Sequence, residues 1–219
     1  MERLSRIAQN SSEHKSIKNI GFIVYQADKE NTPCYHAHMR YFIGCHIRGE
    51  AAEFVKATTS DLAARFGITD VTTIAPPYMT VKAPFERNNL EMVEEVISLA
   101  TEVPPRPLTL SGWNHFDNRT IFIDAKDSSP ELTSYLRSVL AKLRAIGLPV
   151  NPLEDKLHLH LSVARFLKPK EYEEIWKYLS TIPVPKFDIM FDNLTIYTKE
   201  KKEDKAWKTL KTFPLTGRI

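Results

Sequence analysis

The most regular hydrophobic pattern of the chain lies in residues 156–166, KLHLHLSVARF. Leucine and valine alternate there with His158, His160 and Ser162. Alternation with a period of two is typical of a β-strand that has one face in a hydrophobic core and the other outside it. The pattern therefore predicts a strand whose polar face carries two imidazoles and a hydroxyl.

The rest of the chain divides into interleaved strands and helices. Runs of branched and aromatic residues predict strands, and apolar residues spaced by three or four predict helices. Gly67 and Gly147 are where two helices should stop, and Ser129 before Pro130 is where one should begin. The predicted strands are 21–26, 35–47, 76–85, 107–116, 119–125, 156–166 and the two arms of a closing hairpin, 186–200 and 205–215; the predicted helices are 54–66, 90–100, 130–147 and 172–179.

The order of these elements repeats along the chain. Each half presents a strand, a helix and then a strand with a polar face. No low-complexity linker separates the halves, so we expect one domain over residues 1–219 that is built from two related lobes. Residues 1–20 are polar without a clear period, which predicts an N-terminal arm.

Composition narrows the class of protein. The 219 residues are 42% hydrophobic and 26% charged, which is ordinary for a soluble globular domain. The net charge of +3 is too small to indicate nucleic-acid binding by itself, although it does not oppose a phosphate ligand. No apolar stretch is long enough to span a bilayer, and the first residues lack the apolar centre of a secretory signal. Cys34 and Cys45 form neither a disulfide framework nor a zinc spacing, so we expect a reduced, cytoplasmic protein.

Two short strands carry the candidate chemistry. The second half contains His160-Leu-Ser162-Val-Ala-Arg165, and the first half contains Tyr78-Met-Thr80 within PPYMTVKAPF. In both, a hydroxyl residue follows a ring-bearing polar residue by two positions. One such motif in each half suits a site shared by two lobes.

With these motifs the chain resembles the two-histidine phosphoesterases, a family that includes the bacterial 2′-5′ RNA ligases and cyclic-nucleotide phosphodiesterases. The resemblance runs from about residue 38 onward and implies an α+β fold of two pseudo-symmetric lobes, with antiparallel sheets lining a central cleft and helices outside. Members carry one His-x-Thr/Ser motif in each lobe. The segments that carry the resemblance are MRYFIGCHI, PPYMTVKAPF, LTLSGWNHFDNRTIFIDA, the helix up to Gly147, LHLHLSVARF and the closing hairpin.

One position departs from the family pattern, because Tyr78 stands where the first motif has histidine. The resemblance implies metal-free opening of a 2′,3′-cyclic phosphate or cleavage of a 2′-5′ linkage, for which two imidazoles can exchange protons near neutral pH. A phenol ordinarily ionises near pH ~10 and is a poor base at pH 7. The implied catalytic residues are therefore His160 as base, Tyr78 as proton donor or phosphate ligand, and the hydroxyls of Thr80 and Ser162.

Three cations are candidates for substrate binding, each with an alternative role. Lys82 follows Thr80 on the same predicted face, or it is an exposed lysine at the strand end. His158 reaches the phosphate or replaces the missing histidine, or it lies at the rim. Arg165 matches the motif arginine, but alternation places it opposite Ser162 unless a β-bulge intervenes, and it could instead hold the fold.

Three functions follow from these residues. The first is a phosphodiesterase, weakened or not, acting on 2′,3′-cyclic phosphates or 2′-5′ linkages of RNA or nucleotides. The second is an inactive binder of nucleotides or RNA ends. The third, less favoured, is a metal protein using the pairs His36/His38 and His158/His160, for which further ligands cannot be identified. We expect no cofactor, no metal and no membrane partner, and a phosphate-bearing nucleotide or RNA terminus as ligand.

Overall fold

Alternating strands pair into two four-stranded antiparallel sheets in the part of the chain that the computed structural model describes, residues 39–126, 129–200 and 204–217. One sheet has the order β2-β1-β7-β8 and the other the order β5-β4-β3-β6. The strands are β1 Arg40–His46, β2 Tyr78–Glu86, β3 Arg106–Phe116, β4 Thr120–Ala125, β5 His160–Arg165, β6 Lys186–Phe191, β7 Asn193–Lys199 and β8 Lys208–Pro214.

The helices begin and end near the residues that the sequence indicated. Gly67 ends the first helix in the left-handed conformation, with φ of 66°, and its N–H donates to the carbonyl of Ala63. Ser129 caps another helix by accepting a hydrogen bond from the Leu132 N–H at 3.1 Å. The helices are α1 Gly49–Phe66, α2 Glu91–Ala100, α3 Pro130–Ala145 and α4 Pro169–Leu179, with short 3-10 turns η1 Val71–Thr73 and η2 Pro152–Lys156.

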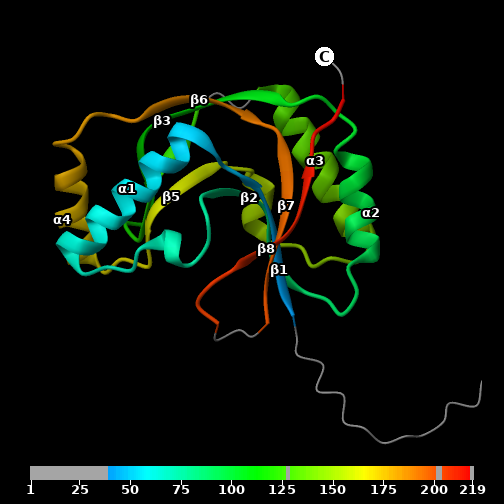
Figure 1. Cartoon of the computed structure of the whole chain (residues 1–219), viewed down its shortest axis with the longest axis horizontal. Helices are drawn as coiled ribbons and strands as arrows, with labels where there is room; N and C mark the ends of the chain where they lie inside the picture. The colour runs from blue at the N-terminus through cyan, green and yellow to red at the C-terminus, as the bar shows by residue number, and fades with distance from the viewer. Residues whose placement is uncertain (1–38, 127–128, 201–203, 218–219) are drawn as a thin grey trace, which may run out of the picture. The chain divides into compact units, whose positions relative to one another are not determined.

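The two sheets correspond strand by strand. The unit β1-α1-β2 in one matches β4-α3-β5 in the other, and in both sheets the motif strand is the edge strand. Helices α1 and α3 each contact a strand of the other lobe's sheet. Helix α1 contacts β5, β6 and α4, whereas α3 contacts β2 and α2 (Figure 1). Side chains from both lobes, including Ile43, Leu62 and Ile123, form one hydrophobic cluster. The prediction of a two-lobed α+β fold is therefore confirmed.

The strand predicted at residues 156–166 is shorter than its alternation suggested, since β5 begins only at His160. Residues 152–156 form η2, and Leu157 has a positive φ of 42°. The Leu159 N–H donates to the Leu157 carbonyl at 3.1 Å, which closes a tight turn just before the strand. His158 therefore precedes the strand instead of belonging to it.

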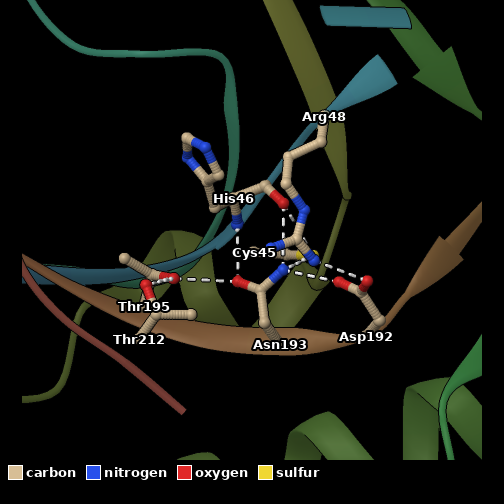
Figure 2. Close-up of polar contacts among 7 residues, drawn as sticks. All are labelled: Cys45, His46, Arg48, Asp192, Asn193, Thr195 and Thr212. Carbon is tan, nitrogen blue, oxygen red and sulfur yellow. Dashed lines mark hydrogen bonds and ion pairs between the residues drawn. The ribbon is translucent and has the colours of Figure 1, made fainter. Parts of the chain in front are cut away.

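The predicted first arm of the closing hairpin, 186–200, is also wrong as a single strand. It divides at Asp192 into β6, which pairs with β3, and β7, which pairs with β1, so the chain crosses from one sheet to the other. The side chain of Asn193 occupies this crossing (Figure 2). Its Oδ1 accepts from the His46 N–H at 2.9 Å and from Thr195 Oγ1 at 2.8 Å, while its Nδ2 donates to the His46 carbonyl at 2.9 Å.

Several expectations fall outside the described residues: the arm at 1–20, the strand at 21–26, the start of the strand at 35–47, and the pair His36 and His38. The single domain over 1–219 accordingly stays a prediction. Among the described helices, none combines the length and the apolar character needed to cross a membrane.

Candidate active site

The two motif strands meet where β2 begins and β5 ends. Arg165 Nη1 donates a hydrogen bond to Tyr78 Oη at 3.3 Å, which ties the end of one edge strand to the start of the other. Tyr78, Ser162 and Arg165 also share the wall of a small cavity of about 20 Å³, room for roughly one water. The structure thus brings these three predicted residues together.

A β-bulge decides where Arg165 lies. Ser162 is paired with Phe122, but Ala164 is paired with Ile121, so Val163 is an extra residue on β5. Directly paired residues of neighbouring strands point to the same side of a sheet. Ala164 therefore lies on the core side with Ile121, and Arg165 returns to the side of Ser162. The sequence left open whether a β-bulge lies between Ser162 and Arg165. The bulge is present, and it places Arg165 on the polar face of the sheet.

The corresponding bulge in β2 has the opposite effect on Lys82. Thr80 is paired with Gly44, whereas Lys82 is paired with the fully buried Ile43, so Val81 is the extra residue. The expectation that Lys82 shares the face of Thr80 is wrong. Its side chain is 1% exposed, and its Nζ donates to Glu154 Oε1 at 2.6 Å and to the carbonyl of Pro149 at 2.9 Å. This ammonium is used inside the protein, away from Tyr78.

His160 stands at the start of β5 among aromatic rings. The ring centroids of Phe116 and Phe122 lie 4.9 Å and 4.8 Å from its own. Its Nδ1 donates to the carbonyl of His158 at 2.7 Å, because a carbonyl can only accept. The pKa of His160 is lowered to about 4, first by burial and further by the nearby His158 and Arg165. The imidazole is therefore neutral at pH 7, with an unprotonated Nε2.

A chain of polar groups that the sequence analysis missed holds His158. Its Nε2 lies 2.7 Å from Asp124 Oδ1, and Asp124 Oδ2 accepts from Asn114 Nδ2 at 3.0 Å. Asp124 is cross-strand partner to His160, so all of these side chains gather at one end of the sheet. Alternation in 119–125 places Thr120, Phe122 and Asp124 on one face, which is the signal that could have identified the carboxylate.

Tyr78 corresponds to His160 by its place in the sheet, and its ring also lies among aromatic rings. The centroids of Phe42 and Tyr197 are 4.6 Å and 5.4 Å from that of Tyr78. Gly44 permits this packing, because a Cβ there would lie 3.3 Å from the Tyr78 ring and 2.7 Å from the Met79 carbonyl.

The cross-strand partner of Tyr78 is a histidine, His46. His46 Nδ1 lies 3.0 Å from the hydroxyl of Tyr197, and burial lowers the pKa of His46. No group of three or more histidine, cysteine or acidic side chains suited to hold a metal ion occurs in the described ranges.

Taken together, the two motif strands carry a neutral imidazole with a free nitrogen, a phenol, a guanidinium and two half-buried hydroxyls, those of Thr80 and Ser162. An imidazole of this kind can accept a proton, and the other groups can donate hydrogen bonds to an oxyanion. This set suits transfer chemistry at a phosphate better than it suits binding of an apolar ligand.

Comparison with known proteins places this geometry in a family. The chain is 25% identical over 148 residues to a protein of Geobacillus thermodenitrificans provisionally named a phosphoesterase, an alignment that covers 66% of this chain and 82% of that protein. Crystal structures of TT0787 from Thermus thermophilus and of E. coli LigT complexed with 3′-AMP superpose with TM-scores of 0.58 and 0.53.

Each superposition covers 82% of this chain, at 17% identity, and 100% and 98% of the respective structures. The pattern of the 2′-5′ RNA ligase superfamily matches residues 51–203, most of the chain. The protein therefore belongs to the 2′-5′ RNA ligase superfamily.

Proposed function

We propose that this protein is a metal-independent phosphodiesterase that opens 2′,3′-cyclic phosphates or cleaves 2′-5′ linkages at RNA ends or in nucleotides. The observation that carries the proposal is the hydrogen bond from Arg165 to Tyr78, which joins the two motif strands where Tyr78, Ser162 and Arg165 line one small cavity. Family membership supports the reaction class, and the E. coli relative crystallised with 3′-AMP supports a nucleotide ligand.

The chain's own groups divide the work in this proposal. His160 takes the proton from the attacking water through Nε2, since its Nδ1 is committed to the His158 carbonyl. Thr80, Ser162 and Arg165 hold the phosphate oxygens, and charge-assisted bonds from the guanidinium are the strongest of these. Tyr78 accepts from Arg165 and therefore keeps its own O–H free to donate to the phosphate.

The test is turnover of 2′,3′-cyclic AMP and of a 2′-5′ dinucleotide in the presence of EDTA, followed by product analysis. We expect hydrolysis by the wild-type protein and loss of roughly 10²- to 10⁴-fold in His160→Gln. His115→Gln is the matched control, because His115 packs against Tyr172 and Trp176 of α4. No turnover of either substrate by the wild-type protein would refute the proposed activity.

A second function, nucleotide binding without catalysis, is favoured by one observation. Tyr78 takes the place in β2 that His160 takes in β5, and it packs among aromatic rings and presents a phenol in place of an imidazole. Calorimetric titration with adenosine 2′- and 3′-monophosphates separates the two. Micromolar binding that is weakened in Arg165→Ala, together with no hydrolysis, would establish the binder.

We also propose a cytoplasmic location. Cys45 is a buried free thiol, which fits a reducing compartment.

A further inference from the structure

The lobe that contains His160 carries a second histidine, His158. A carboxylate contacts its ring, as is common for catalytic imidazoles. Asn114 donates to Asp124, and Asp124 receives the Nε2–H of His158 at 2.7 Å. The Asp124 side chain is 12% exposed, whereas the His158 side chain is 40% exposed. A largely buried carboxylate thus orients a ring that remains open to solvent.

The second histidine stands next to the proposed base. The ring centroids of His158 and His160 are 6.1 Å apart, and the rings are nearly perpendicular, at 86°. Phe116 and Phe122 contact both rings edge-on or tilted, with centroid distances between 4.8 Å and 5.5 Å. These contacts fix the two imidazoles relative to each other.

The two rings differ in the nitrogen left for proton exchange. His160 uses Nδ1 toward a carbonyl, so Nε2 is its free nitrogen; His158 uses Nε2 toward Asp124, so Nδ1 is free. In an in-line displacement at phosphorus the attacking and leaving oxygens lie on opposite sides, about 4 Å apart, and each needs a partner at about 2.8 Å. Two imidazoles separated by 6.1 Å can serve the two oxygens.

We propose that His158, oriented by Asp124 and Asn114, is the general acid of this site and supplies the proton transfer for which Tyr78 is poorly suited. This inference rests on the proposed phosphodiesterase activity. The oxygen of water forms the new bond to phosphorus while its proton passes to His160 Nε2. The bond from phosphorus to the ribose oxygen breaks, and that oxygen takes the proton from His158 Nδ1. Solvent then returns the proton from His160 to His158.

The experiment compares a poor and a good leaving group. His158→Gln retains an amide able to bond Asp124 but cannot exchange a proton. On 2′,3′-cyclic AMP we expect its kcat to fall by roughly 10²- to 10⁴-fold with KM changed less than about threefold. On the 4-nitrophenyl ester of 2′-deoxyadenosine 3′-phosphate, whose nitrophenolate leaves without a proton, the loss should be less than about tenfold. His160→Gln should lose activity on both substrates, and His115→Gln on neither.

Each outcome decides the matter. Wild-type kcat in His158→Gln on cyclic AMP would overturn the inference and leave the proposed function intact. Equal losses on both substrates would also overturn it, because a merely structural role does not depend on the leaving group. Asp124→Asn should show the same substrate-dependent loss as His158→Gln in milder form. Failure of the wild-type protein to open cyclic AMP would overturn the function and the inference together.

Discussion

Arg165 and Tyr78 are 87 positions apart in the sequence, yet the guanidinium of the first donates a hydrogen bond to the phenol of the second at 3.3 Å. The contact joins the two lobes at their motif strands. It exists because a bulge at Val163 returns Arg165 to the polar face of its sheet. In the proposed function, the same contact gives Tyr78 a role in phosphate binding that needs no proton exchange by the phenol.

If His158 already serves as acid, a histidine at position 78 should matter only when His158 is lost. We expect Tyr78→His to change kcat on 2′,3′-cyclic AMP by less than about tenfold in the wild-type background, and to recover roughly 100-fold in the His158→Gln background. Steady-state kinetics of the four proteins measures this coupling. The control is Tyr78→Phe, which should rescue nothing. An equal gain in both backgrounds would contradict the overlap of roles.

The depressed pKa of His160 predicts how stability depends on pH. The unfolded chain takes up a proton on this ring near pH ~6.5, but the folded protein does so only near pH 4, because burial disfavours the cation. Between these values the unfolded state binds more protons, so the free energy of unfolding falls as pH falls. Above pH 6.5 the ring is neutral in both states and contributes no pH dependence.

Urea unfolding at pH 7.5 and pH 5.0 tests this expectation in the wild-type protein and His160→Gln. The wild-type protein should lose about 1 to 2 kcal/mol more than the variant over this interval. His46, whose pKa is also lowered, is unchanged in both proteins and so cancels in the comparison. Identical losses in the two proteins would show that His160 titrates normally in the fold.

The buried pair of Lys82 and Glu154 should stabilise the fold only while both partners are present. Lys82→Met removes the cation 2.6 Å from a carboxylate that is 4% exposed and leaves it only the longer contact with Arg144, at 3.7 Å. We expect a cost of about 3 to 5 kcal/mol in the free energy of unfolding. The double variant Lys82→Met/Glu154→Leu should recover most of this loss. Lys56→Met, which breaks the exposed pair with Glu53, is the control and should hardly change stability.

Chemical denaturation of the wild-type protein and these three variants measures the loss of stability and its recovery. A double variant as unstable as the single one would argue that Lys82 acts by packing instead of by charge. If the folded double variant still hydrolyses cyclic AMP, that result would agree with a position of Lys82 and Glu154 outside the candidate active site.

The crossing between sheets depends on the amide of Asn193. In Asn193→Asp an oxygen replaces Nδ2 and faces two acceptors, the His46 carbonyl and the carboxylate of Asp192, which Nδ2 now contacts at 2.9 Å and 2.6 Å (Figure 2). We expect a loss of about 2 to 4 kcal/mol, measured by urea unfolding. The control is Asn89→Asp, since exposed Asn89 only accepts, from the Glu91 N–H. A loss no larger than in the control would mean that the amide network is dispensable.

Local chemistry in the sequence determined much of the architecture. The helices stop at Gly67 and begin after Ser129 because these residues satisfy backbone groups within one turn of themselves. The polar face with His160 and Ser162 follows from alternation alone, since neighbouring side chains in a strand point to opposite faces. The two-lobed α+β fold likewise followed from the repeated element order and the family resemblance.

Tertiary structure decided the features that one extra residue can reverse. Bulges at Val81 and Val163 moved Lys82 into the core and Arg165 onto the polar face, because an extra residue shifts the side chain that follows it to the other side of the sheet. The turn at Leu157 separates His158 from β5. Asp124 contacts His158 only because β4 pairs with β5. Such outcomes depend on which partners are available across the sheet, and a sequence read along one strand does not contain that information.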